Sequence, residues 1–200
     1  WWFENDNLEN NLFIFSGDVT GHGAGPAMIT ATVASNFLTM RRSSEKNKLK
    51  YILEDMSTQL SYLAKQAYLM SAFAVNFDFN AKKVLFFSAG GPQPIILKKN
   101  GTFDFLTLSG APLGSANTLI NTIEKEINSG DRIYIFTDGI IEMKQANGRA
   151  FGERKLISIF KKYSAQSPED SVQSIIKELD EIRGSGEQED DYTLIICDIK

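Results

Sequence analysis

The stretch Gly17-Asp18-Val19-Thr20-Gly21-His22-Gly23 is the part of the sequence that says most about the fold. It follows a short apolar run, residues 12–15, and it precedes Pro26, a residue type favoured at the first position of a helix. A glycine-rich segment between an apolar run and a helix start is typical of a loop. The stretch therefore predicts a strand that ends at Gly17-Asp18, a loop, and a helix that begins at Pro26.

Patterns on either side extend this prediction. Upstream, the apolar runs 1–3 and 12–15 flank a polar segment, residues 4–11, which indicates a hairpin with its turn in that segment. Downstream, apolar residues recur at helical spacing over 28–37 and over 49–63, with a polar break at 41–47. We therefore expect a hairpin followed by two amphipathic helices.

The rest of the chain predicts strands and then a second helix pair. Apolar runs favour strands at 73–79, 84–87, 95–97, 103–106, 122–127 and 132–136, with turns at 80–82, 99–101 and 129–131. Helical patterns follow over 153–163 and 168–183, and an apolar strand over 192–199 closes the chain. Because helices and strands are grouped rather than alternating, we expect an α+β fold of antiparallel sheets covered by helices.

Length and composition limit the possible functions. The 200 residues suit one domain, residues 1–200, and the net charge of -4 without a Lys/Arg cluster argues against nucleic-acid binding. The single cysteine, Cys197, cannot form an internal disulfide, and no apolar run is long enough to span a membrane. The chain opens on Trp1-Trp2-Phe3 without an initial Met, so we expect an N-terminally truncated piece of a longer protein.

Three aspartate sites share one placement relative to the predicted strands. Asp18 and Asp138 each follow an apolar run, and the pair Asp190-Asp191 precedes one. Strand ends can meet at one edge of a sheet, and carboxylates gathered there repel one another unless cations lie between them. Carboxylate and carbonyl oxygens suit Mg²⁺ or Mn²⁺, and two such ions can activate a water for attack on phosphorus. Taken singly, each aspartate is more often a turn residue than a metal ligand; the shared placement favours a metal site.

The loop around the only histidine, His22, has two readings. Its glycines, including Gly21 and Gly23, can expose backbone N–H groups to an anion such as phosphate, or they can simply form a tight turn. His22 can act as a general acid or contact phosphate, or it can be an ordinary exposed residue. A histidine-based zinc site, a Walker A loop, a dinucleotide fingerprint, a cysteine phosphatase and a Gly-x-Ser-x-Gly hydrolase are all excluded by the absence of their motifs.

These motifs resemble a known family. The stretch 17–23 with Pro26-Ala27 is similar to the first motif of the bacterial PPM (PP2C-like) serine phosphatases, and more narrowly of their SpoIIE/RsbU branch. Further matching segments occur in family order over nearly the whole chain: Ser88-Ala89-Gly90, Gly110-Ala111-Pro112-Leu113-Gly114, Gly130-Asp131-Arg132, Phe136-Thr137-Asp138-Gly139-Ile140-Ile141-Glu142, Phe151-Gly152 and Asp190-Asp191-Tyr192-Thr193. Each segment alone is weak evidence, whereas the ordered set is specific.

The resemblance implies two stacked antiparallel sheets flanked by helices, an αββα sandwich, and a site for two Mn²⁺ or Mg²⁺ ions. It implies that Asp18 bridges both ions with the Val19 carbonyl on one of them, and that Asp138 and Asp190 hold the other. Asp191 and Gly139 would lie beside these ligands, and Gly21 and Gly23 near the phosphate. Relatives also have an acidic ligand just upstream of residues like Trp1-Trp2, so we expect at most one occupied metal position in this chain, and none at low metal concentration.

The function implied is hydrolysis of phosphoserine or phosphothreonine by a metal-activated water. The substrate implied is a phosphorylated regulatory protein, a STAS-type anti-sigma-factor antagonist. Upstream sensor or regulatory domains would act through the helices between residues 27 and 67, and the location would be cytoplasmic, either free or as part of a membrane-anchored sensor. The alternative is a degenerate phosphatase fold that binds a signalling partner without turnover; the three aspartates argue against it. Where many relatives have His after Ala89-Gly90, this chain has Gly91.

Overall fold

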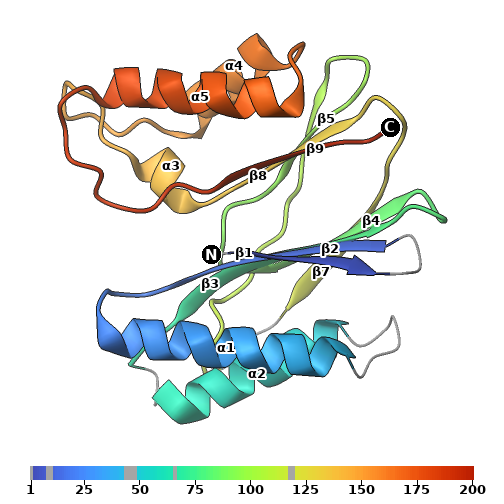
Figure 1. Ribbon diagram of the computed structural model, residues 1–200, viewed down its shortest axis with the longest axis vertical. Coiled ribbons are helices and arrows are strands. Elements are labelled where there is room, and N and C mark those ends of the chain that lie inside the picture. The colour runs from blue at the N-terminus through green and yellow to red at the C-terminus, as the bar shows by residue number, and fades with distance from the viewer. Residues whose placement is uncertain (1, 8–10, 43–48, 65–66, 117–119) are drawn as a thin grey trace. The chain divides into compact units, whose positions relative to one another are not determined.

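The computed structural model describes residues 2–7, 11–42, 49–64, 67–116 and 120–200. The chain divides into two compact units: residues 1–91 with 107–127, and residues 92–106 with 128–200. Each unit contains one antiparallel sheet and its own helices (Figure 1). The predicted α+β class, two antiparallel sheets flanked by helices, is therefore confirmed, while a single domain over 1–200 stays a prediction.

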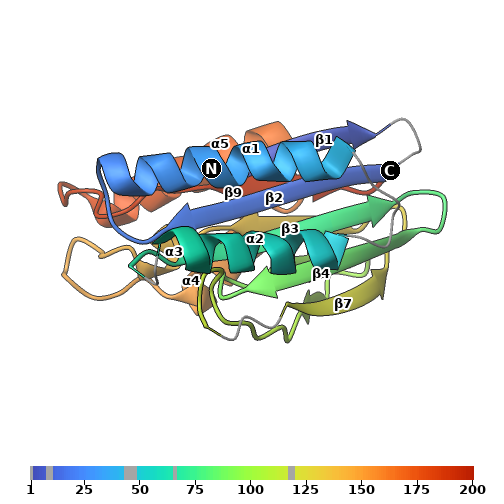
Figure 2. The same cartoon turned by 90° about the horizontal axis from the view of Figure 1, so that it is seen from below.

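The first unit is a five-stranded sheet with a helix pair. Its strands lie in the order β1-β2-β3-β4-β7, and each neighbouring pair is antiparallel. They are β1 (Trp2–Asn7), β2 (Asn11–Val19), β3 (Met70–Asp78), β4 (Lys83–Ala89) and β7 (Asn121–Glu126). The helices α1 (Ala24–Arg42) and α2 (Leu49–Ala64) both lie over one face of this sheet (Figure 2).

Strand alternation explains how the helices cover this sheet. Successive strand residues point to opposite faces, and Phe13, Phe15 and Val19 of β2 share one hydrophobic cluster with Val33 of α1 and Leu53 of α2. The odd-numbered residues of β2 therefore face the helices. The even-numbered residues face the other side of the sheet. Asp18 is one of them, so its side chain points away from α1 and α2.

Three local predictions in this unit need correction. Residues 4–7 were expected in a turn, but they belong to β1, where each pairs with a residue of β2. Polar and charged residues are common on edge strands, where they discourage pairing with a further strand, so a polar sequence does not exclude a strand there. The strand expected to end at Gly17-Asp18 runs on to Val19, and α1 begins at Ala24 rather than at Pro26.

The second unit is a four-stranded sheet with three helices. Its strands lie in the order β6-β5-β8-β9, all antiparallel: β5 (Ile95–Leu97), β6 (Phe103–Phe105), β8 (Arg132–Phe136) and β9 (Leu194–Asp198). The helices are α3 (Asp138–Glu142), α4 (Glu153–Tyr163) and α5 (Pro168–Arg183). The helices α4 and α5 agree with the predicted ranges, whereas the sequence does not predict the short α3. No described helix is long and apolar enough to cross a membrane.

Helix signals and aromatic packing explain how α4 and α5 attach to their sheet. Ser167 caps α5 by accepting a hydrogen bond from the Asp170 N–H at 3.1 Å, and Pro168 occupies its first turn. On α4, Phe160 is fully buried and its ring stacks on Tyr134 of β8, with ring centroids 4.1 Å apart. The strand that leads to the Thr137-Asp138-Gly139 segment is thereby anchored to α4 by a buried aromatic pair.

The turn predicted at 129–131 is present, but Asp131 does more than turn the chain. Its carboxylate is 3 % exposed and accepts hydrogen bonds from Lys98 Nζ (3.0 Å), Asn128 N (3.0 Å) and Lys99 N (3.1 Å). Burial by itself raises the pKa of this carboxyl, but the hydrogen bonds outweigh burial and lower the pKa of Asp131 below its ordinary value of 3.8. The ionised carboxylate therefore stabilises the fold.

This lowered pKa predicts how stability depends on pH. The contribution of Asp131 is complete above the unfolded-state pKa and is lost as the pH falls through the lower folded-state pKa. We expect Asp131→Asn to reduce the free energy of unfolding by about 2 kcal/mol near neutral pH, and by clearly less near pH 3. Urea unfolding of both proteins across this range measures the difference. A difference that stays constant with pH would contradict the assignment.

Candidate metal centre

Asp18 lies at the end of β2 in the first unit. It pairs with Ser71 of β3 in register, and its side chain is exposed, on the sheet face opposite α1 and α2. The preceding Gly17 is buried, and a Cβ at that position would lie 2.1 Å from the Met70 Cε. The end of the Met70 side chain therefore packs against the Gly17 backbone, and a larger residue at position 17 would require that side chain to move.

The loop after β2 leaves the sheet one residue after Val19. Thr20 still donates its N–H to the Leu69 carbonyl at 2.8 Å, and Gly21 and Gly23 then adopt φ values of 90° and 97°. Those values suit glycine and disfavour other residues. Val19 buries its side chain in the core of the first unit, so only its backbone is available for binding. His22 is exposed in the loop.

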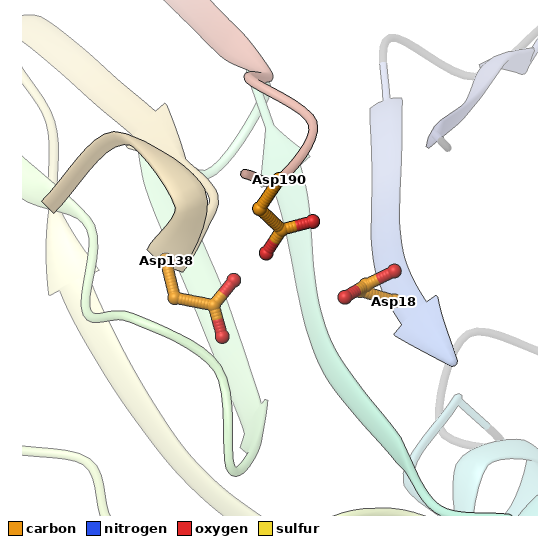
Figure 3. A group of neighbouring side chains, drawn as sticks. All are labelled: Asp18, Asp138 and Asp190. Atoms are coloured by element: carbon orange, nitrogen blue, oxygen red, sulfur yellow. The ribbon is translucent and has the colours of Figure 1, made fainter. Parts of the chain in front are cut away.

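Asp138 and Asp190 lie in the second unit, and the structure brings them together. Asp138 is the first residue of α3 and is separated from the end of β8 only by Thr137, and Asp190 lies in the loop before β9. A carboxylate oxygen of Asp138 and one of Asp190 are within 4.8 Å of each other. The expectation that strand ends collect these two carboxylates is therefore correct within this unit; Figure 3 labels both side chains together with Asp18.

The geometry of the Asp138–Asp190 pair fits a hard divalent cation. Each carboxylate accepts a hydrogen bond from the next backbone N–H, Gly139 N at 3.2 Å and Asp191 N at 2.8 Å, through its Oδ1 atom. The Oδ2 atoms of Asp138 and Asp190 take no part in these two hydrogen bonds. Two oxygens that bind one Mg²⁺ at about 2.1 Å lie at most about 4.2 Å apart, so only a small movement of either side chain is needed.

Gly139 and Asp191 contact each other through the backbone. A Cβ at Gly139 would lie 2.5 Å from the Asp191 carbonyl oxygen and 3.3 Å from the Asp190 Cβ. The loop that carries Asp190 therefore packs directly on α3, and only glycine permits this approach. The exposed Asp191 side chain is not what makes the contact.

Thr137 is a residue of this site to which the sequence reasoning assigned no role. Its hydroxyl donates to the Asp191 carbonyl at 3.2 Å and accepts from the Thr193 N–H at 3.0 Å. Its backbone N–H also donates to the Thr193 carbonyl at 3.1 Å. A threonine before Asp-Gly at a strand end could have suggested a capping residue, but its partners lie more than fifty residues away in the sequence.

Comparison with known proteins gives a family match over most of the chain. Residues 9–200 match the family described as stage II sporulation protein E (SpoIIE). This match covers every aspartate of the candidate site and the whole glycine-rich loop.

Solved structures are similar over nearly the whole chain. The SiaA-PP2C domain of Pseudomonas aeruginosa superposes with a TM-score of 0.88 at 18% identity, covering 100% of this chain and 80% of that one. The RsbU and RsbW domains of a Mycobacterium tuberculosis protein give 0.76 at 21% identity, covering 98% and 53%. RsbX in complex with magnesium gives 0.71 at 17% identity, covering 98% and 84%. At such identities the similarity establishes the fold.

Proposed function

Because this chain belongs to the SpoIIE family and has the fold of PP2C phosphatase domains, we propose that it is a metal-dependent protein serine/threonine phosphatase. The observation that carries the proposal is the Asp138–Asp190 pair, whose carboxylate oxygens lie within 4.8 Å of each other at the ends of β8 and β9. Two carboxylates held this close are costly unless a cation neutralises them. A divalent cation between them would remove this repulsion, and this supports a metal site.

The full ligand set that we propose includes residues of both units. Asp18 would supply a third carboxylate and Val19 a backbone carbonyl, as the family resemblance implies, in addition to the Asp138–Asp190 pair described above. In support, Asp18 is exposed on the helix-free face of its sheet, and all these donors are hard oxygen ligands. Either Mn²⁺ or Mg²⁺ suits them, and one structural relative, RsbX, is known in complex with magnesium.

The bound cation, the aspartates and the glycine-rich loop would each have a separate role in hydrolysis. A bound divalent cation would activate water and neutralise charge on the phosphoryl group. The aspartates would hold and orient it. The backbone N–H groups of the loop at Gly21 and Gly23 would face the phosphate oxygens, and His22 would contact the phosphate or donate a proton to the leaving serine oxygen.

We propose a phosphorylated regulatory protein as the substrate, an anti-sigma-factor antagonist of the STAS type. The support is the family itself and a relative in which an RsbU domain and an RsbW domain are solved together. Regulatory domains of the same polypeptide would act through α1 and α2, and the reaction would take place in the cytoplasm.

The test is phosphate release from a phosphoserine-bearing STAS-domain protein by the purified protein. We expect release that requires Mn²⁺ or Mg²⁺, stops with EDTA and returns when Mn²⁺ is added in excess. A free phosphoserine peptide, offered in parallel, shows how far recognition depends on the folded substrate. Tight Mn²⁺ binding without any release from either substrate would contradict the proposal and favour a module that binds partners without turnover.

A further inference from the structure

Thr137 is the helix N-cap residue of α3, yet it does not cap that helix. Its backbone is extended, with φ of -91° and ψ of 161°, as expected for a cap, but its side chain makes no capping hydrogen bond. The hydroxyl is used elsewhere, on Asp191 and Thr193. The Thr137 hydroxyl therefore bonds the loop before β9 instead of the first turn of its own helix, and this indicates a role in holding that loop.

The loop held in this way is the one that carries Asp190. Regular pairing of β8 and β9 ends at Phe136 and Leu194, and the Thr137–Thr193 backbone hydrogen bond extends it by one step. Beyond that point β8 and β9 no longer pair. The Thr137 hydroxyl there bonds the Asp191 carbonyl and the Thr193 N–H, which lie on either side of Tyr192. Gln188 donates to the Asp190 carbonyl at 2.9 Å, but it lies in the same loop and so does not fix the loop relative to Asp138. Glu189 forms an ion pair with Lys144 at 2.6 Å, and because both side chains are more than half exposed, that pair constrains the loop only weakly.

We propose that the Thr137 hydroxyl is a positioning group that sets the separation of the Asp138 and Asp190 carboxylates. This inference rests on the proposed metal site. Thr137 is covalently next to Asp138, and its hydroxyl holds the carbonyl of Asp191, the residue next to Asp190. Gly139 allows that same carbonyl to approach α3 closely. The Thr137 hydroxyl and the close approach at Gly139 therefore hold the Asp190 segment next to the Asp138 segment.

The chemistry of the hydroxyl makes the inference testable. It donates to one backbone group and accepts from another, which serine can also do and valine cannot. Valine has nearly the shape of threonine, so Thr137→Val removes both bonds with little change in packing. Thr137→Ser keeps both bonds and removes only a methyl group.

The experiment is Mn²⁺ binding to the metal-free protein by calorimetry, which does not depend on turnover. We expect Thr137→Val to weaken Mn²⁺ binding about 10- to 100-fold, the usual effect of removing a group that orients a metal ligand. Thr137→Ser should retain wild-type affinity. The control is Thr102→Val, which removes a hydroxyl that is hydrogen-bonded to Asn100 at 2.6 Å in the same unit. This control should also retain wild-type affinity.

A second measurement separates positioning from stability. Amide hydrogen exchange at Thr193 should become faster in Thr137→Val and stay unchanged in Thr137→Ser, while the melting temperature reports any general loss of stability. If Thr137→Val lowers the melting temperature but binds Mn²⁺ like the wild type, and Asp138→Asn still abolishes binding, the positioning role is wrong and the metal site stands. If the wild type binds no Mn²⁺, both the metal site and this inference are wrong.

Discussion

Asp18→Asn is expected to lower metal-dependent phosphate release by roughly 1,000-fold, because a divalent cation in a phosphoryl-transfer site supplies several kcal/mol of transition-state stabilisation. Asparagine keeps the size of aspartate and one carbonyl oxygen but removes the charge that would hold the cation. Asp18 is exposed, so the change does not leave a buried group without a partner. The fold and the free energy of unfolding should therefore stay close to those of the wild type.

The matched control for this variant is Asp78→Asn. Asp78 lies at the opposite end of the same strand pair, where it pairs with Asn11, while Asp18 pairs with Ser71. Asparagine can still accept the hydrogen bond that Asp78 receives from the Ala81 N–H at 2.9 Å. Phosphate release and Mn²⁺ affinity should be unchanged in Asp78→Asn. Wild-type activity and affinity in Asp18→Asn would show that Asp18 is not a ligand.

The acidic residues of the site could be found from the sequence because they follow a local rule. Asp138 stands at a strand end and Asp190 just before a strand, and neighbouring strands of one sheet bring such residues together. The role of Thr137 could not be found in this way. Its hydrogen bonds join positions 137 and 193, and nothing in the residues around either position indicates the other.

The errors in the predicted fold also trace to distant contacts. The sequence predicts a strand end at Gly17-Asp18 because glycine is common in turns, whereas β2 continues to Val19 because its pairing with β3 continues through Gly17–Ala72 to Val19–Met70. The short α3 was missed because five residues are too few to show helical periodicity. In contrast, α4 and α5 were predicted well because their apolar faces repeat over several turns.

Arg132 is the residue of the second unit whose replacement we expect to destabilise the fold most. It is 6 % exposed, and it donates to both carboxylate oxygens of Asp198, which lies opposite it on β9. It also donates to the Ser171 hydroxyl at 2.9 Å and to the Gln166 carbonyl at 2.8 Å. The bonds to Asp198 raise the pKa of Arg132 further above its already high value. One guanidinium thus joins β8, β9 and the start of α5.

Replacing Arg132 with methionine should lower the free energy of unfolding by about 3 kcal/mol, because it leaves Asp198 and the fully buried Ser171 without their donor. For a protein of this size, that corresponds to a fall in melting temperature of roughly 6 to 12 °C.

Arg132→Lys should recover only part of the loss, since an ammonium group cannot form the paired bonds to Asp198. Arg149→Met, at an exposed arginine of the same unit, is the control and should cost less than about 0.5 kcal/mol. Urea unfolding of the three variants measures these values, and an Arg132→Met protein as stable as the control would contradict the structural role of this guanidinium.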